Sequence, residues 1–193
     1  MLKRAVRHFR DGLLSLGYPE ECKVCGNAIE SWDDGVACER CWTDRTVTSF
    51  FADLSCCDHC GTPLQPIAGR KIPSESRARC NMCRDHPYFA ARACGEYDGA
   101  IEASIIFQKV HPYINPRMRE MINQTLARHS FNLASDFVMP VPLHRIRERE
   151  RGFNQALIVA RLVARTLELE VRRQVLARVK YTERHRAGMD ARD

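Results

Sequence analysis

The sequence predicts a small metal-binding domain followed by an α/β domain. Four Cys-x-x-Cys units lie in its first half, and such repeated units are typical of zinc ribbons. After them, the segments follow the order strand, helix, helix, strand, loop, helix, strand, which favours an α/β sheet. The hydrophobic content of 45% and the charged content of 28% are ordinary for a globular protein of 193 residues.

An amphipathic helix is expected over residues 1–16, within an N-terminal segment that extends to residue 19. Val6, Phe9 and Leu13 belong to its apolar stripe, which we expect to pack in a core rather than on a membrane. The charged residues in this segment exclude a signal peptide, and no stretch of the sequence is long and apolar enough to span a bilayer. We therefore expect a cytoplasmic protein, in which paired cysteines more often hold metal than form disulfides.

The eight cysteines of the four units are the expected metal ligands. Two residues between thiolates let one tight turn direct both sulfurs at a single tetrahedral ion. A glycine follows directly at positions 26 and 61, where a positive φ turns backbone N–H groups toward the sulfurs. The ligands are Cys22, Cys25, Cys38, Cys41, Cys57, Cys60, Cys80 and Cys83.

Two structural zinc ions are predicted for the domain spanning residues 20–87. The first four cysteines would hold one ion and the last four the other, since 12 and 19 residues separate the units of each pair. A cross-braced arrangement, in which units one and three share an ion, uses the same ligands and stays open. Iron–sulfur ligation is the rival interpretation, but two well-separated pairs per site suit zinc ribbons better. Cys56 and His59 could act as alternative ligands, although such neighbours are more often bystanders, and Cys94 is expected to be a buried thiol.

The second domain is expected over residues 88–193. Asn115 and Pro116 form a predicted helix start, with proline at the first helical position. Asn154 and Gln155 are expected to cap the long helix that follows the loop. The predicted elements are a strand over 88–97, helices over 100–110 and 116–129, a strand over 136–141, a helix over 152–169 and a strand within 171–179.

An arginine-rich loop is predicted over residues 143–152, between the second strand and the long helix. Guanidinium groups pair bidentately with phosphate, and a helix N-terminus adds N–H groups and a favourable dipole. The distribution of charge also favours phosphate binding, because residues 144–193 contain 13 Lys and Arg against 7 Asp and Glu, a difference of +6. The alternative is surface pairing of the arginines with Glu148 and Glu150. The pattern predicts a phosphate-rich partner, either a nucleic acid or a phosphorylated small molecule.

Three motifs resemble those of the ComF family, along the whole chain. The first is Leu-Gly-Tyr-Pro-Glu-Glu-Cys22-Lys-Val-Cys25-Gly, and the second is the short helix that ends in Ile105-Ile-Phe-Gln-Lys109. The most specific is Pro140-Val-Pro-Leu-His144 continuing to Arg151-Gly-Phe-Asn-Gln155. The resemblance implies a double zinc ribbon followed by a type I phosphoribosyltransferase-like α/β domain, and a link to competence and DNA uptake.

The resemblance also implies which residues contact phosphate. In that fold, the loop after the first core strand faces the pyrophosphate of phosphoribosyl pyrophosphate, which binds with magnesium. The candidate phosphate contacts are therefore Arg145, Arg147, Arg149, Arg151 and, more weakly, Lys109. The family's acidic pair and Thr-Thr-Gly turn, which hold the ribose and its 5′-phosphate, have no counterpart in this sequence. We therefore expect an incomplete transferase-like domain with no catalytic residue assigned.

Three functions follow as hypotheses. The first is a zinc-binding ComF-like protein for DNA uptake or handling, with single-stranded DNA or proteins of the competence machinery as partners. The second is an active phosphoribosyltransferase, which requires a longer native chain or a second protomer to supply the missing loop. The third is a zinc-ribbon module that binds nucleic acid or protein through its basic flank, a role that needs aromatic and basic residues on the ribbon.

Overall fold

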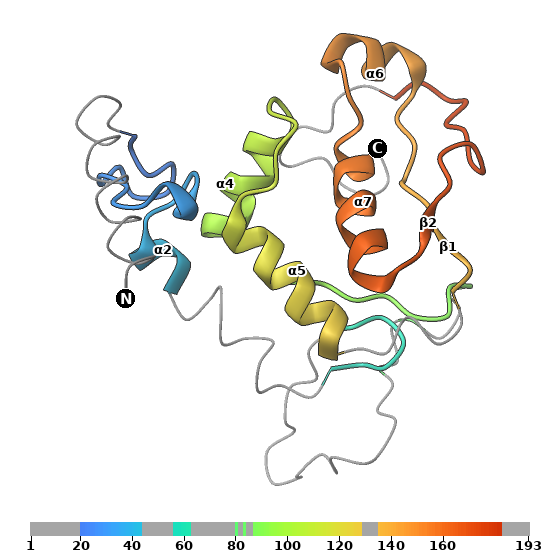
Figure 1. Cartoon of the computed structure of the whole chain (residues 1–193), viewed down its shortest axis with the longest axis horizontal. Coiled ribbons are helices and arrows are strands. Elements are labelled where there is room, and N and C mark those ends of the chain that lie inside the picture. Colours follow the sequence, from blue (N-terminus) through green and yellow to red (C-terminus); the bar gives the residue numbers. More distant parts are fainter. Residues whose placement is uncertain are drawn as a thin grey trace, which may run out of the picture. The chain divides into compact units, whose positions relative to one another are not determined.

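The chain forms two compact units, Met1–Phe131 and Asn132–Asp193 (Figure 1). The computed structural model describes residues 20–43, 56–62, 80, 83, 87–128 and 135–182. The predicted N-terminal helix over residues 1–16 therefore lies outside the described residues. The first unit continues past residue 87, where we predicted the end of the ribbon, and includes the next two helices.

The described part of the first unit begins with a Cys-x-x-Cys turn and two short helices. An antiparallel bridge between Glu21 and Ala28 closes the turn around the first cysteine pair. The 3-10 helix η1, Trp32–Asp34, and the helix α2, Glu39–Thr43, follow it. The helices α4, Gly99–Gln108, and α5, Pro116–Arg128, complete the described part of this unit and confirm the two predicted helices.

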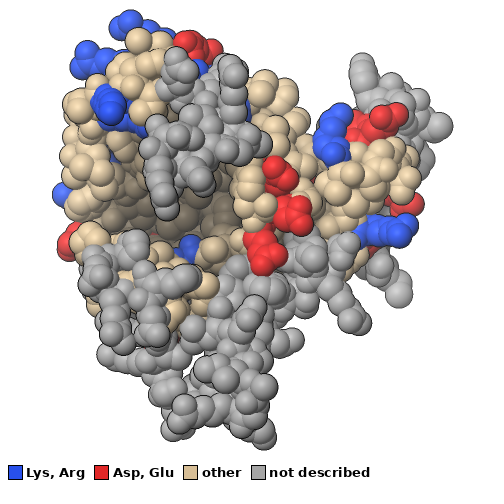
Figure 2. Space-filling view, turned by 180° about the vertical axis from the view of Figure 1, so that it is seen from behind, with Lys and Arg blue, Asp and Glu red and all other residues tan. Residues whose placement is uncertain are grey.

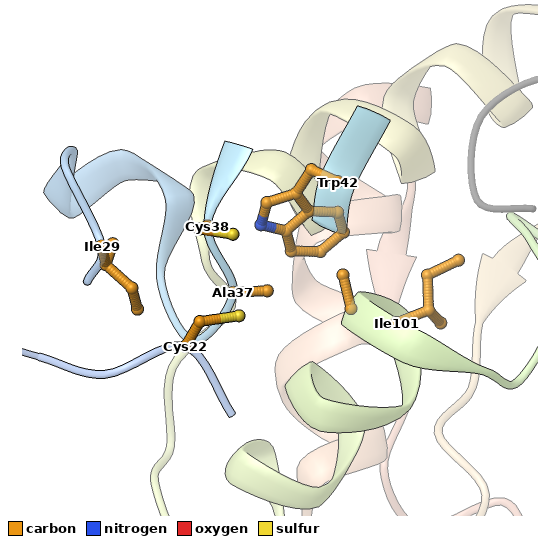
Figure 3. Packing of buried hydrophobic residues seen from close by; sticks show 7 residues of the cluster. Cys22, Ile29, Ala37, Cys38, Trp42 and Ile101 are labelled. Carbon is orange, nitrogen blue, oxygen red and sulfur yellow. The ribbon is translucent and has the colours of Figure 1, made fainter. Parts of the chain in front are cut away.

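One hydrophobic core joins the ribbon to α4 (Figure 3). Trp42 of α2 belongs to this core, with 2% of its surface exposed, and its indole Nε1 donates a 2.7 Å hydrogen bond to the Asp34 carbonyl oxygen. Two metal-ligand candidates are themselves part of this core, so the packing of α4 and the geometry of the first cysteine group are joined. The buried residues of the cluster are Cys22, Ile29, Ala37, Cys38, Trp42, Ala100 and Ile101.

Asn115 fixes the start of α5 and the approach of η1. Its Oδ1 accepts from the Met118 N–H at 2.8 Å, which satisfies an N–H that the first helical turn leaves unpaired. Its Nδ2 donates to Ser104 Oγ of α4 at 2.9 Å. Gly35 (φ +71°) lies so close that a Cβ there would be 2.8 Å from the Asn115 Cβ. The predicted Asn-Pro helix start is confirmed, and it also locks α4 and α5 together.

The strand predicted over residues 88–97 is wrong, because the structure is irregular there. The backbone in this segment bonds to the second cysteine turn instead of a neighbouring strand: Ala91 N donates to the His59 carbonyl oxygen at 2.7 Å. Small residues and Gly95 add little side-chain packing of the kind that stabilises a sheet. Apolar composition without a pairing partner was therefore insufficient to form a strand.

The second unit is a parallel β-α-β arrangement. The strands β1, Phe137–Val138, and β2, Glu170–Val171, pair in parallel with Phe137 opposite Glu170. The helix α7, Gln155–Leu167, buries Leu157, Ala160 and Ala164 and packs on both strands. β1 is shorter than the predicted strand 136–141, because the prolines at positions 140 and 142 have no N–H for a β ladder.

The predicted arginine loop is in fact a helix, α6, Arg145–Arg151. Arginine and glutamate both favour helix, and their alternation allows an i,i+3 pair between Arg147 and Glu150 at 3.2 Å. His144 caps the start, with its ring Nδ1 accepting from Ile146 N at 3.3 Å, and Gly152 (φ +79°) ends the helix in the left-handed conformation. Among the described residues, no helix combines the length and apolar character that crossing a membrane requires.

Candidate metal centres and a basic pocket

The structure gathers the eight cysteines into two groups of consecutive units. Cys22, Cys25, Cys38 and Cys41 form the first group, and within each group all sulfurs lie within 4.8 Å of one another. The Sγ atoms of Cys22 and Cys41 are 3.7 Å apart, and those of Cys25 and Cys38 are 3.6 Å apart. This grouping is the consecutive arrangement rather than the cross-braced one.

The second group consists of Cys57, Cys60, Cys80 and Cys83. Its Sγ–Sγ distances are 3.6 Å between Cys57 and Cys83, 3.5 Å between Cys60 and Cys80, and 3.4 Å between Cys80 and Cys83. Cys57 is fully buried and Cys83 is 3% exposed. The sulfurs in both groups are too far apart for disulfides, in which they would be about 2 Å apart.

The two groups share one backbone design. In the first, Gly26 N donates to the Cys22 carbonyl oxygen at 2.9 Å and Cys22 N donates to Asn27 O at 2.8 Å. In the second, Gly61 N donates to Cys57 O at 2.8 Å and Cys57 N donates to Thr62 O at 2.9 Å. Both glycines have the positive φ that the sequence predicted, +75° and +73°. The duplicated motif therefore folds twice into the same turn.

These groups fit a tetrahedral metal ion. Zinc–sulfur bonds of about 2.3 Å place the corners of a tetrahedron about 3.8 Å apart, close to the observed sulfur separations. Soft thiolate ligands in this geometry suit zinc, and two such groups provide for two ions. Four sulfurs occupy every position of a tetrahedral ion, so the donor set suits a structural role rather than a catalytic one.

Backbone N–H groups of each turn lower the pKa of a cysteine thiol. Burial raises the pKa of Cys22, but N–H groups of Cys38, Cys25 and Val24 outweigh burial and lower that pKa to about 6.

Cys57 follows the same pattern, since burial raises its pKa while N–H groups, including that of Cys80 at 3.3 Å, lower it to about 6. In contrast, burial and neighbouring sulfurs raise the pKa of Cys83 to about 12. The lowered pKa values of Cys22 and Cys57 favour their thiolate forms, which are the forms that bind a metal cation.

Cys56 and His59 belong to neither group, as the sequence led us to expect. His59 is 6% exposed and its Nε2 lies 2.5 Å from the Tyr88 carbonyl oxygen, so it ties residues 88–91 to the second cysteine turn. Cys94 is half-buried, and burial raises its pKa despite a side-chain hydrogen bond with Thr125. It is less buried than the sequence predicted.

The candidate arginines of α6 point in different directions. Arg147 Nη1 pairs with Glu150 Oε2 at 3.2 Å, and its guanidinium lies 5.1 Å from the Tyr181 ring centroid. Arg151 Nη1 donates to Gln155 Oε1 at the start of α7. Arg149 is exposed. Figure 2 shows basic side chains at the α6 end of the second unit, with acidic ones beside them. Two of the four arginines therefore make structural contacts.

Arg145 is the α6 arginine that lines a pocket of 810 Å³ in the second unit. One wall comes from residues 140–148, at the carboxyl end of β1 and the start of α6, with Asn154 and Leu157 of α7. The other wall is residues 173–179, which follow β2 and include Arg173 and Arg178. Lys109 belongs to the first unit, where its N–H caps α4 and its side chain is exposed.

Sequence reasoning missed the second wall of this pocket. Arg173 and Arg178 follow the carboxyl end of a parallel strand, which is where ligands of α/β sheets bind. Their position after a predicted strand is the sequence signal that could have identified this wall. The predicted role of Asn154 as a cap is confirmed: its Oδ1 accepts from Ala156 N at 2.9 Å. Its Nδ2 also donates to Val141 O at 3.0 Å, which tethers the pocket wall to α7.

Competence protein F of Haemophilus influenzae is 28% identical to the chain over 151 residues, which cover 71% of the chain. The chain is a homologue of Competence protein F. The resemblance to the ComF family that the motifs indicated is thereby confirmed. The match covers 58% of the length of Competence protein F, so the chain spans little more than half of that protein. No family model matches the chain, and no solved structure matches it.

Proposed function

We propose that the chain is a zinc-binding ComF-like protein that acts in DNA uptake or DNA handling during competence. The observation that carries this proposal is the similarity to Competence protein F over 151 residues. The two four-cysteine groups support it, because the resemblance implied a double zinc ribbon and these groups suit two zinc ions. The domain plan that accompanies the proposal is a ribbon over 20–87 and a phosphoribosyltransferase-like domain over 88–193, in the cytoplasm.

Zinc has a structural role in this proposal. Cys22 and Cys38 are part of the core that holds Trp42 and α4, so an ion that fixes these sulfurs also fixes that core. Small cysteine-rich domains of this kind gain folding free energy directly from metal binding. The backbone N–H groups around Cys22 and Cys57 lower the pKa of both thiols, which favours the thiolate form that zinc binds.

Binding of phosphate groups is the proposed task of the second unit. Arg145, Arg173 and Arg178 line the pocket from both sides, and guanidinium groups bind phosphate strongly. A pocket at the carboxyl ends of two parallel strands is the usual ligand position in an α/β sheet. Single-stranded DNA and proteins of the competence machinery are the proposed partners.

A transformation assay in cells that naturally carry this protein tests the proposal. Deletion of the gene should lower the frequency of transformation by added DNA without changing growth, and the wild-type chain should restore it. The variant Arg178→Ala should restore less than Arg165→Ala, an exposed arginine of α7 outside the pocket lining. Unchanged transformation after deletion would remove the competence role.

A phosphoribosyltransferase activity is the second candidate, favoured by the position of the pocket in a parallel β-α-β unit. It requires an acidic pair and a Thr-Gly turn from another segment or protomer, with magnesium. Calorimetry of the chain with phosphoribosyl pyrophosphate and magnesium tests it. Binding that depends on magnesium supports the candidate, and an absence of heat at millimolar ligand excludes it for this chain.

A further inference from the structure

The pocket of the second unit combines a charged rim with an apolar surface. Three arginines and one glutamate are among its lining residues, which amounts to a net charge of +2 from these four groups. Glu148 Oε1 lies 3.8 Å from Arg173 Nη2, so the carboxylate offsets one guanidinium. The apolar lining residues include Pro140, Leu143, Leu157, Leu176 and Val179.

The apolar lining is partly open to solvent. Leu176 is 53% exposed and Val179 is 88% exposed, whereas Leu157 of α7 is 7% exposed. Inorganic phosphate or pyrophosphate would satisfy the arginines but would leave these side chains in water. A ligand that also carries a flat, weakly polar group would bury them, at a gain of about 25 cal/mol for each Å² of apolar surface covered.

The wall that carries Leu176 and Val179 is anchored at both of its ends. Near its start, Arg173 pairs with Glu148 of α6. Beyond its end, the Tyr181 ring meets the His144 ring edge-on with centroids 5.3 Å apart and lies under the Arg147 guanidinium. Contacts therefore connect the two walls near both ends of residues 173–179.

We propose that this pocket binds a nucleoside phosphate, with the phosphate at Arg145 and Arg178 and the base against Leu143, Leu176 and Val179. The proposal rests on the phosphate-binding role proposed above and adds the base as a second requirement. The volume of 810 Å³ is within the usual range for small-ligand sites, about 300–1,000 Å³. Gln174 in the same wall offers both an amide donor and an acceptor to a base edge.

A free nucleotide and one residue of a single-stranded nucleic acid present the same chemistry. Calorimetry of the zinc-loaded full chain separates them with four probes: deoxyadenosine monophosphate, deoxyadenosine, inorganic phosphate, and a thymidine oligonucleotide of about 15 residues. The monophosphate should bind at least about tenfold more tightly than the nucleoside or inorganic phosphate. If only the oligonucleotide binds, the ligand is a nucleic acid chain rather than a free nucleotide. The variants described below must then change the affinity for the oligonucleotide.

Two variants test the two halves of the pocket. Arg178→Ala should weaken binding of the monophosphate or oligonucleotide about tenfold or more. Leu176→Ser should weaken it severalfold while leaving the affinity for inorganic phosphate unchanged, because it removes apolar contact and no charge. Arg165→Ala is the control and should change neither. Thermal unfolding of each variant, compared with the wild type, identifies any that simply fail to fold.

Each result has a defined meaning. Equal affinity for inorganic phosphate and for the monophosphate, unaffected by Leu176→Ser, overturns the nucleoside inference and leaves the phosphate-binding role intact. Binding of none of the four probes overturns both the inference and that role. The competence role is judged separately by the deletion arm of the transformation assay, which does not depend on this pocket's ligand.

Discussion

Arg117 Nε of α5 lies 2.9 Å from Asp34 Oδ1 at the end of η1, a contact between residues 83 positions apart in the sequence. The Asp34 side chain is 6% exposed, while that of Arg117 is 42% exposed. Arg117 Nη2 also lies 3.8 Å from Glu39 Oε1 of α2. One arginine thus joins α5 to both ends of the segment that carries Cys38.

Replacing Arg117 with alanine should destabilise the first unit by about 1–3 kcal/mol, because it leaves the buried Asp34 carboxylate without this donor. The control is Arg119→Ala, an exposed arginine of the same helix, which should change stability by less than about 0.5 kcal/mol. Urea unfolding of the zinc-loaded protein measures both. Equal effects for the two variants would show that the Asp34 contact contributes nothing to stability.

Loss of metal from the first group should loosen α4. Cys22 and Cys38 share a buried cluster with Ala100 and Ile101, so sulfurs that separate without an ion disturb the packing of that helix. In a Trp32→Phe background, Cys25→Ser should shift the fluorescence of Trp42 to longer wavelength and raise amide exchange in α4 about tenfold or more. Cys60→Ser in the second group is the matched control and should leave Trp42 emission unchanged.

Zinc affinity should become more steeply dependent on pH below about 6. The pKa values of Cys22 and Cys57, lowered to about 6, mean that both are thiolates above that pH and need lose no proton on binding. As pH falls through 6 each gains a proton that zinc must displace, so the slope of log affinity against pH should rise by about one per site. Competition titrations with a chromophoric chelator between about pH 5 and about pH 8 measure this slope. A constant slope would show that the two thiols titrate elsewhere.

Asn154 should stabilise the second unit through both of its side-chain hydrogen bonds. Asn154→Ala removes the helix cap and the tether to Val141, and should cost about 1–3 kcal/mol. Asn154→Ser keeps a capping oxygen and loses only the tether, so it should fall between alanine and the wild type. Thermal unfolding monitored by α7 amide signals tests this order. A serine variant as unstable as the alanine variant would show that the tether, not the cap, is what matters.

Local chemistry was enough to predict the two four-cysteine groups. Thiol spacing and the two glycines act within a few residues, so the Cys-x-x-Cys turns and their positive φ values followed from the sequence. The Asn115–Pro116 helix start and the Asn154 cap are equally local. The family resemblance rested on three motifs, of which the one that ends at Gln155 is the most specific, and the similarity to Competence protein F confirms the resemblance.

The features that sequence reasoning missed depend on partners distant in the chain. Residues 88–97 have the composition of a strand, but their backbone bonds to His59 instead. The Arg-Glu alternation of 145–151 was read as a loop, although a cap at His144 and a terminator at Gly152 make it a helix. The second pocket wall became visible only when Arg173 and Arg178 came to face residues 140–148.

Because residues 145–151 form a helix, the position of each arginine around the helix axis decides which guanidinium groups face the pocket. The number of arginines alone does not decide how much positive charge lines it. Residues two apart on a helix project about 200° from one another, so Arg145 and Arg149 share one side and Arg147 and Arg151 the other. Insertion of a single residue before Arg145 would turn the whole set by about 100°. A related sequence with the same four arginines and one extra residue at that place would therefore present a different pair to the ligand.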